Sequence, residues 1–210
     1  MTDIDIVQVC GLILWGIFYG SYLAKVMLER KKGITVSRMC VGEKEISARV
    51  IEVFLLFFTY GTAAVQLLSV FVYHKWERLL AGNESMDAAA GMHFAGAFNL
   101  AGMVLAVAGI VFFVSAMKEM KENWRAGIDE NQNTCMVTGG IYKISRNPAF
   151  VGFDLFYAGY GILFSNGLML LFAVLAIFTL HMQIKEEEKY MEKRYGRAYR
   201  AYKEKVRRYL

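Results

Sequence analysis

The sequence predicts an all-α integral membrane protein with about five transmembrane helices and a C-terminal amphipathic helix at the cytoplasmic face. The chain has 210 residues and is 56% hydrophobic. Several of its apolar runs approach the roughly 20 residues that a helix needs to cross a bilayer. Charged residues make up 20% of the chain and are bunched between these runs. By its length we expect a single membrane-embedded domain over residues 1–210.

Each apolar run predicts one element of this fold. The first three runs form an N-terminal part, residues 1–117, and a helical hairpin and a charged helix belong to residues 118–210. In the third run Ala95, Gly102 and Gly109 are seven residues apart, so they share one helix face and permit close contact with another helix. The spans are expected at residues 6–27, 50–73, 92–117, 149–164 and 168–182, before the charged helix at residues 185–210.

The distribution of basic residues predicts the orientation in the membrane. Residues 25–49 contain seven Lys or Arg, residues 74–91 contain two, residues 117–147 contain five, and the tail from residue 183 contains ten. Loops rich in Lys and Arg stay in the cytoplasm. The alternation therefore predicts an N-terminus outside, with the central polar segment and the C-terminus in the cytoplasm.

The charge and the spacing of potential metal ligands argue against two kinds of partner, nucleic acid and metal ions. The net charge of +5 is explained by basic residues beside membrane spans, so it gives no reason to expect nucleic acid. Cys10, Cys40 and Cys135 show no paired spacing, and no cluster of His, Cys and carboxylates has the spacing of a metal site. We expect membrane lipids as partners, with no metal and no nucleic acid.

One stretch, residues 138–150, stands between a polar segment and an apolar one. It contains Pro148, the only proline, preceded by Asn147. Proline suits the first position of a helix, and asparagine is a good cap before it. The free N–H groups and the dipole at such a helix start bind anions, and Arg146 adds a charged group beside them. The alternative is a plain membrane helix start with an arginine that reaches the interface.

The C-terminal helix carries an apolar and aromatic stripe at helical spacing. Glu187 lies on the same side as this stripe and is expected to point inward, where it needs a partner in the fold or in a ligand. Glu186 and Glu188 are expected to face solvent or to pair with lysines. The stripe consists of Met191, Tyr195, Tyr199, Tyr202, Val206 and Tyr209.

These motifs carry a resemblance to a known family. Thr138-x-Gly140-x-Tyr142 followed by Arg146-Asn147-Pro148-x-Phe150-x-Gly152 resembles the T-x-G-x-Y…R-H-P-x-Y-x-G signature of the isoprenylcysteine carboxyl methyltransferases, relatives of the phospholipid N-methyltransferases. The run from Glu187 to Val206 is similar to the closing motif of that family. Residues 123–129 resemble a W-R-x-G-I-D run of its prokaryotic members. The resemblance covers residues 120–210.

The resemblance implies that S-adenosyl-L-methionine binds between these motifs, while a lipid-like acceptor enters from the bilayer. Arg146 and Asn147 take the catalytic positions, and Glu187 binds the cofactor from the C-terminal helix. Asn147 replaces a histidine of the family pattern, and Phe150 replaces a tyrosine. The cofactor-binding positions carried over are Thr134, Cys135, Met136, Val137, Gly140, Tyr142, Asn147, Pro148, Ala149, Phe150 and Glu187.

Further residues are candidates for contact with the acceptor. Asp154 lies within the fourth span, where a carboxylate either contacts a substrate or pairs with a structural partner. Gln183 stands where the eukaryotic prenylcysteine enzymes carry a substrate-side arginine. Phe153, Phe156 and Tyr157 are expected to line a lateral opening on the fourth span.

The leading hypothesis is therefore an S-adenosylmethionine-dependent methyltransferase that acts on a membrane-associated amphiphile with a carboxylate or amine head. A second hypothesis is an NADPH-dependent enzyme similar to the sterol reductases, which have a similar C-terminal half. A third is a non-enzymatic small transporter or scaffold. A transporter or scaffold would give Arg146, Asn147 and Glu187 no shared role.

Overall fold

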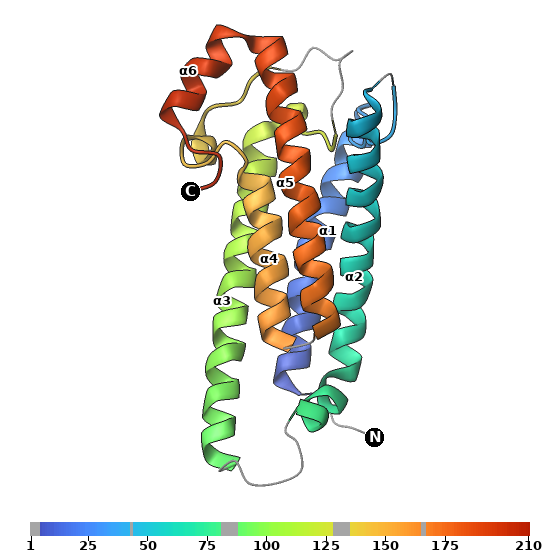
Figure 1. Cartoon of the computed structure of the whole chain (residues 1–210), viewed down its shortest axis with the longest axis vertical. Coiled ribbons are helices and arrows are strands. Elements are labelled where there is room, and N and C mark those ends of the chain that lie inside the picture. The colour runs from blue at the N-terminus through green and yellow to red at the C-terminus, as the bar shows by residue number, and fades with distance from the viewer. Residues whose placement is uncertain (1–4, 43, 81–87, 128–134, 165–166) are drawn as a thin grey trace.

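The computed structural model is a bundle of long helices that run along one axis (Figure 1). It describes residues 5–42, 44–80, 88–127, 135–164 and 167–210, with the side chains in these ranges except those of residues 74–95. The predicted all-α architecture is confirmed. The helices are α1 (Ile6–Lys31), α2 (Ile46–Leu80), α3 (Ala88–Met120), α4 (Pro148–Phe164), α5 (Gly167–Tyr195) and α6 (Arg197–Lys205), with the short 3-10 helices η1 (Lys121–Asn123) and η2 (Gly140–Lys143).

The helices have the lengths and surfaces of an integral membrane protein. Within the described residues, α1, α2, α3 and α5 are each long and apolar enough to cross a bilayer. The fourth helix, α4, is apolar but has only 17 residues. Large apolar side chains such as Phe57 and Phe71 of α2 lie exposed on the outside of the bundle, as expected of a surface that faces lipid.

The end of the fifth span differs from the prediction. We expected the membrane span to stop near residue 182 and a separate charged helix to follow. Instead α5 continues without a break to Tyr195, and only then does Gly196, with φ of +51°, turn the chain into α6. No glycine or proline interrupts residues 168–195, so nothing in the backbone ends the helix where its side chains become charged.

Close packing of α3 against α4 confirms the prediction made from the spaced glycines. A Cβ added at Gly109 would lie 2.6 Å from the backbone N of Phe156, and one at Gly102 would lie 2.6 Å from the backbone N of Leu163. Gly152 of α4 faces the backbone of Phe113 in the same way. The two helices therefore approach each other through backbone atoms, as small residues allow in membranes.

Replacing Gly109 with alanine is expected to destabilise the bundle by about 1–3 kcal/mol, because the added methyl group must push two helix backbones apart. Gly20→Ala is the control, since a Cβ at Gly20 meets no atom within 4 Å. Thermal melting in detergent measures both variants. Equal melting temperatures for the two would show that α3 and α4 separate without cost.

Candidate functional site

A cavity of about 460 Å³ lies inside the bundle at the end where α6 folds back. Its walls come from parts of the chain that are far apart in sequence: α1 and α2 on one side, α4, α5 and α6 on the other, and the loops between them. The side from α1 and α2 is almost wholly apolar and aromatic. The residues of that side are Trp15, Phe18, Tyr19, Tyr22, Leu23, Leu55, Leu56, Thr59, Tyr60 and Ala63.

The opposite side carries the polar groups. Glu187 and Gln183, one helical turn apart on α5, both line the cavity, and Gln183 Nε2 donates to Glu187 Oε1 at 3.3 Å. Gln183 Oε1 is buried without a hydrogen-bond partner among the described residues. Burial, and next the negative charge of Glu187, raises the pKa of Tyr142 above its ordinary value. The Tyr142 hydroxyl thus stays neutral and can donate a hydrogen bond within the cavity.

The start of α4 is built as predicted. Pro148 is the first residue of the helix, and the carbonyl of Asn147 accepts the N–H of Val151 at 3.1 Å. Ala149 and Phe150, in the first turn, line the cavity. The first N–H groups of a helix have no partner within it. The positive end of α4 therefore faces the same space as Glu187.

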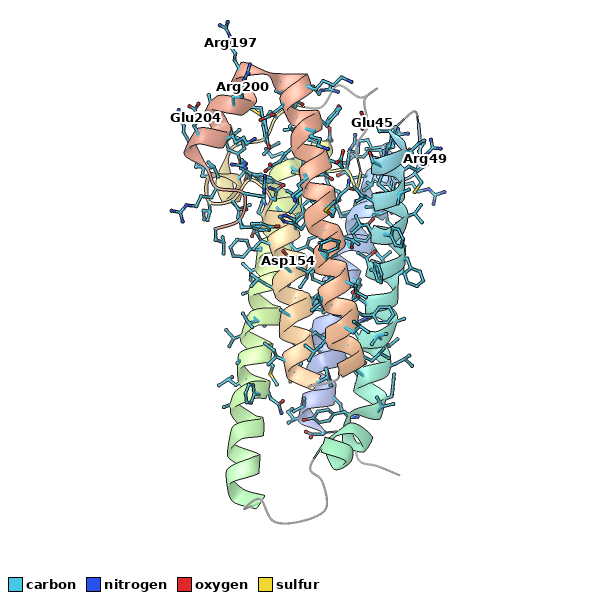
Figure 2. All side chains as sticks on the ribbon, viewed as in Figure 1. Glu45, Arg49, Asp154, Arg197, Arg200 and Glu204 are labelled. Carbon is cyan, nitrogen blue, oxygen red and sulfur yellow. The ribbon has the colours of Figure 1, made fainter. Side chains whose placement is uncertain are left out.

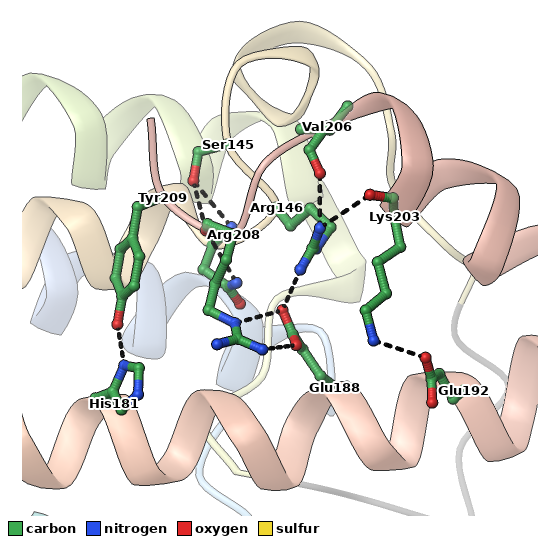
Figure 3. Close-up of polar contacts among 10 residues, drawn as sticks. Ser145, Arg146, His181, Glu188, Glu192, Lys203, Val206, Arg208 and Tyr209 are labelled. Atoms are coloured by element: carbon green, nitrogen blue, oxygen red, sulfur yellow. Dashed lines mark hydrogen bonds and ion pairs between the residues drawn. The ribbon is translucent and has the colours of Figure 1, made fainter.

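Arg146 is held by the C-terminal strap, residues 206–210, and by Glu188 (Figure 3). Its guanidinium pairs with Glu188 Oε1 at 2.8 Å, and both side chains are only 7% exposed. It also donates to the carbonyl of Val206 at 2.7 Å, and Arg208 pairs with the other oxygen of Glu188 at 2.7 Å. The expectation that Glu188 faces solvent or a lysine is wrong, because two arginines from distant segments converge on it.

Two comparisons with known proteins bear on the class of this protein. Residues 98–198 match the family model described as phospholipid methyltransferase. This match covers just under half of the chain and indicates a membrane methyltransferase. It is also similar to the protein-S-isoprenylcysteine O-methyltransferase of Schizosaccharomyces pombe, with 34% identity over 77 residues, 36% of this chain. The match spans about a third of that relative, 33% of its length.

Residues 98–198, the segment that matches the family model, contain most of the predicted site. The cavity is lined by eleven of the residues given a catalytic, cofactor or acceptor role, whereas Met136, Gly140, Pro148, Asp154 and Phe156 do not line it. Thr134 lies outside the described residues. No observation tests the roles given to these residues, so the roles stay predictions. The lining residues are Cys135, Val137, Tyr142, Arg146, Asn147, Ala149, Phe150, Phe153, Tyr157, Gln183 and Glu187.

Asp154 lies in the bundle near the α6 end (Figure 2), away from the wall of the cavity. Burial raises the pKa of Tyr209 in the strap, and the charge of Asp154 raises it further. The hydroxyl of Tyr209 contacts His181 Nδ1 of α5 at 2.5 Å. Asp154 Oδ1 is buried without a hydrogen-bond partner among the described residues, so the structure shows no structural partner for it and both alternatives for Asp154 stay predictions.

The lateral side of the cavity differs from the prediction. Phe153 and Tyr157 of α4 line the cavity, but Phe156 is fully buried and stacks on Phe18 with ring centroids 3.9 Å apart. Instead, Leu23 of α1 and Tyr60 of α2 both line the cavity and are 57% and 70% exposed. The exposed large apolar side chains that line the cavity therefore belong to α1 and α2.

Sequence reasoning missed the part of the site that lies before the segment matching the family model. Ser37 and Met39, in the loop after α1, line the cavity together with the aromatic residues of α1 and α2. The resemblance covered residues 120–210 and carried no information about this region. A usable signal was Glu52, an acid at the start of an apolar run. Within the described residues, no group of three or more His, Cys, Asp or Glu is placed to hold a metal ion.

Proposed function

We propose that the protein is an S-adenosylmethionine-dependent methyltransferase whose acceptor is an amphiphile from the bilayer. The observation that carries the proposal is the continuity of one cavity. Its polar end is formed by Glu187, Gln183 and the start of α4, and its apolar end reaches lipid-exposed side chains of α1 and α2. The polar methyl donor can thus bind at one end of the cavity while the lipid tail of the acceptor binds at the other.

The polar end fits the chemistry of this cofactor. Ribose hydroxyls and an amino group are hydrogen-bond donors, and they need acceptors such as the carboxylate of Glu187 and the unpartnered Oε1 of Gln183. The cofactor carboxylate suits the free N–H groups of Ala149 and Phe150 at the start of α4. Phe150 and Tyr142 offer aromatic faces to an adenine ring or a cation.

The residues of the chain are proposed to act by binding and orientation. When bound, S-adenosylmethionine would supply an electrophilic methyl group on a sulfonium; transfer to the acceptor head would break the S–CH₃ bond and leave S-adenosylhomocysteine. Such a reaction needs the two partners in line and water excluded. Glu187 and Gln183 fix one partner from α5, and the aromatic wall of α1, α2 and α4 keeps the cavity dry and holds the tail of the other.

The orientation in the membrane is part of the proposal. The labelled charged residues Glu45, Arg49, Arg197, Arg200 and Glu204 gather at the α6 end of the bundle (Figure 2). The basic loops predict that this end lies in the cytoplasm. Accordingly, we propose that the polar end of the cavity opens to the cytoplasmic pool of cofactor.

A calorimetric titration tests the donor. The purified protein in detergent is titrated with S-adenosylhomocysteine and, separately, with NADPH. Binding of S-adenosylhomocysteine alone is the expected result. Binding of NADPH without S-adenosylhomocysteine would favour the reductase alternative and overturn the proposal.

Glu187→Ala is expected to weaken binding of S-adenosylhomocysteine roughly ten- to a hundredfold, because one hydrogen bond to a charged group contributes about 1.5–3 kcal/mol. Glu186→Ala is the matched control. The carboxylate of Glu186 pairs with Lys189 at 2.7 Å, and Glu186 does not line the cavity. Calorimetry on the two variants compares the affinities, and an equal loss in both would remove Glu187 from the site.

A further inference from the structure

The loop between α1 and α2 forms a wall of the cavity. Ser37 and Met39 of this loop line the cavity beside Ala126 and Gly127, which follow α3. The two segments are joined by a short parallel bridge. Arg38 donates its backbone N–H to the carbonyl of Ala126 at 2.8 Å, and Ala126 donates its own to the carbonyl of Val36 at 2.9 Å. The N-terminal part of the chain thus covers the polar end of the cavity.

A buried carboxylate holds this loop in place. Glu52, near the start of α2, is 0% exposed and pairs with Lys44 Nζ at 2.7 Å. It also accepts the backbone N–H of Cys40 at 2.6 Å, and Lys44 donates to the carbonyl of Arg38 at 2.7 Å. Cys40 has φ of +59°, a conformation that residues other than glycine rarely adopt and that needs support from its surroundings. One side chain therefore fixes the loop at two points.

The contact between the loop and the segment after α3 is tight. Gly127 has φ of +90°, and a Cβ there would lie 3.0 Å from the backbone N of Met39 and 3.2 Å from Glu52 Oε1. Glu187 lies within electrostatic reach of both Glu52 and Lys44. A displacement of the loop would thus change the space beside Glu187.

We propose that Glu52 is a positioning residue for the cofactor site: it fixes the α1–α2 loop as a wall of the cavity and raises cofactor affinity without lining the cavity itself. This inference rests on the proposed function for the identity of the ligand. The placement of the loop by Glu52 rests on the hydrogen bonds alone.

The first experiment compares Glu52→Gln with Glu29→Gln. Glu29 is a matched control, because it is also buried and pairs with Lys25 at 2.7 Å, but it does not line the cavity and holds no residue that does. Both variants break a buried ion pair, so both should melt at lower temperature. Only Glu52→Gln is expected to weaken S-adenosylhomocysteine binding, by about tenfold, because small displacements of binding groups have large effects.

An equal affinity in the two variants would overturn the inference. Failure of the unchanged protein to bind S-adenosylhomocysteine would instead overturn the proposed function. A double variant, Glu52→Gln with Lys44→Met, separates loop position from general stability. It removes the lysine that has lost its carboxylate partner and keeps only the carbonyl of Arg38, so the melting temperature should recover while the affinity stays low. Recovery of the affinity together with the melting temperature would also overturn the inference.

A ligand-free measurement tests the placement of the loop directly. In a Cys10→Ala, Cys135→Ala background, Cys40 is the remaining thiol, and it is half-buried. Glu52→Gln is expected to increase the rate at which a maleimide labels Cys40 by about tenfold, because the open state of the loop becomes more populated. The Glu29→Gln variant should label at the original rate. An unchanged rate in Glu52→Gln would show that another contact holds the loop.

Discussion

Shortening the acceptor tail by six methylene groups is expected to lower kcat/KM by about three orders of magnitude or more. Each buried methylene contributes about 0.8 kcal/mol, so six contribute roughly 5 kcal/mol. The expectation follows from the apolar wall that Trp15, Tyr22 and Leu56 form in the cavity. Initial rates of matched acceptors that differ only in chain length, at equal subsaturating concentrations, measure the effect.

A variant on α2 provides the control for this experiment. Ala63 lines the cavity, whereas its neighbour Ala64 lies exposed on the outside of the helix. Ala63→Phe should fill the apolar end and slow the long-chain acceptor, and Ala64→Phe should not. Both variants should keep their affinity for S-adenosylhomocysteine. Equal rates for long and short acceptors in the unchanged protein would show that the tail stays outside this cavity.

Replacing Arg146 with alanine is expected to destabilise the protein by about 3 kcal/mol or more. Breaking a buried ion pair leaves a buried charge without one of its partners, and Glu188 is held in this way by Arg146. The loss also releases the carbonyl of Val206, so the C-terminal strap should detach. Thermal melting in detergent measures the stability, and digestion by a carboxypeptidase measures release of the strap.

Lys143→Ala is the control for Arg146→Ala, because Lys143 is exposed on η2 nearby. It should melt like the unchanged protein and keep its strap. Activity should fall more in Arg146→Ala than in Lys143→Ala, since the start of α4 loses its support. Equal melting temperatures in the two variants would show that Glu188 is satisfied by Arg208 alone.

The parts of the site that local chemistry determines could be predicted from the sequence. Asn147 and Pro148 mark a helix start by their own conformational preferences, and α4 begins there. Glu187 was expected to point inward from its spacing to the aromatic stripe, and it lines the cavity. In both cases the information lies within a few residues of the feature.

The parts that depend on pairing between distant segments could not be predicted. Nothing near Glu188 shows that Arg208, twenty residues later, and Arg146 will meet on it. The prediction for the end of the fifth span was wrong for a different reason. Hydropathy reports where a chain leaves the membrane, whereas a helix ends only where its backbone is interrupted, here at Gly196.

The origin of the two sides of the cavity has a consequence for how such proteins diversify. Glu187 and Gln183 belong to residues 98–198, the segment that matches the family model, while much of the apolar wall comes from α1 and α2, which precede it. Selection for a new acceptor can therefore act on the first two helices and leave the shared segment unchanged. Chimeras that exchange only residues 1–80 between relatives should transfer the preference for the tail and keep the donor.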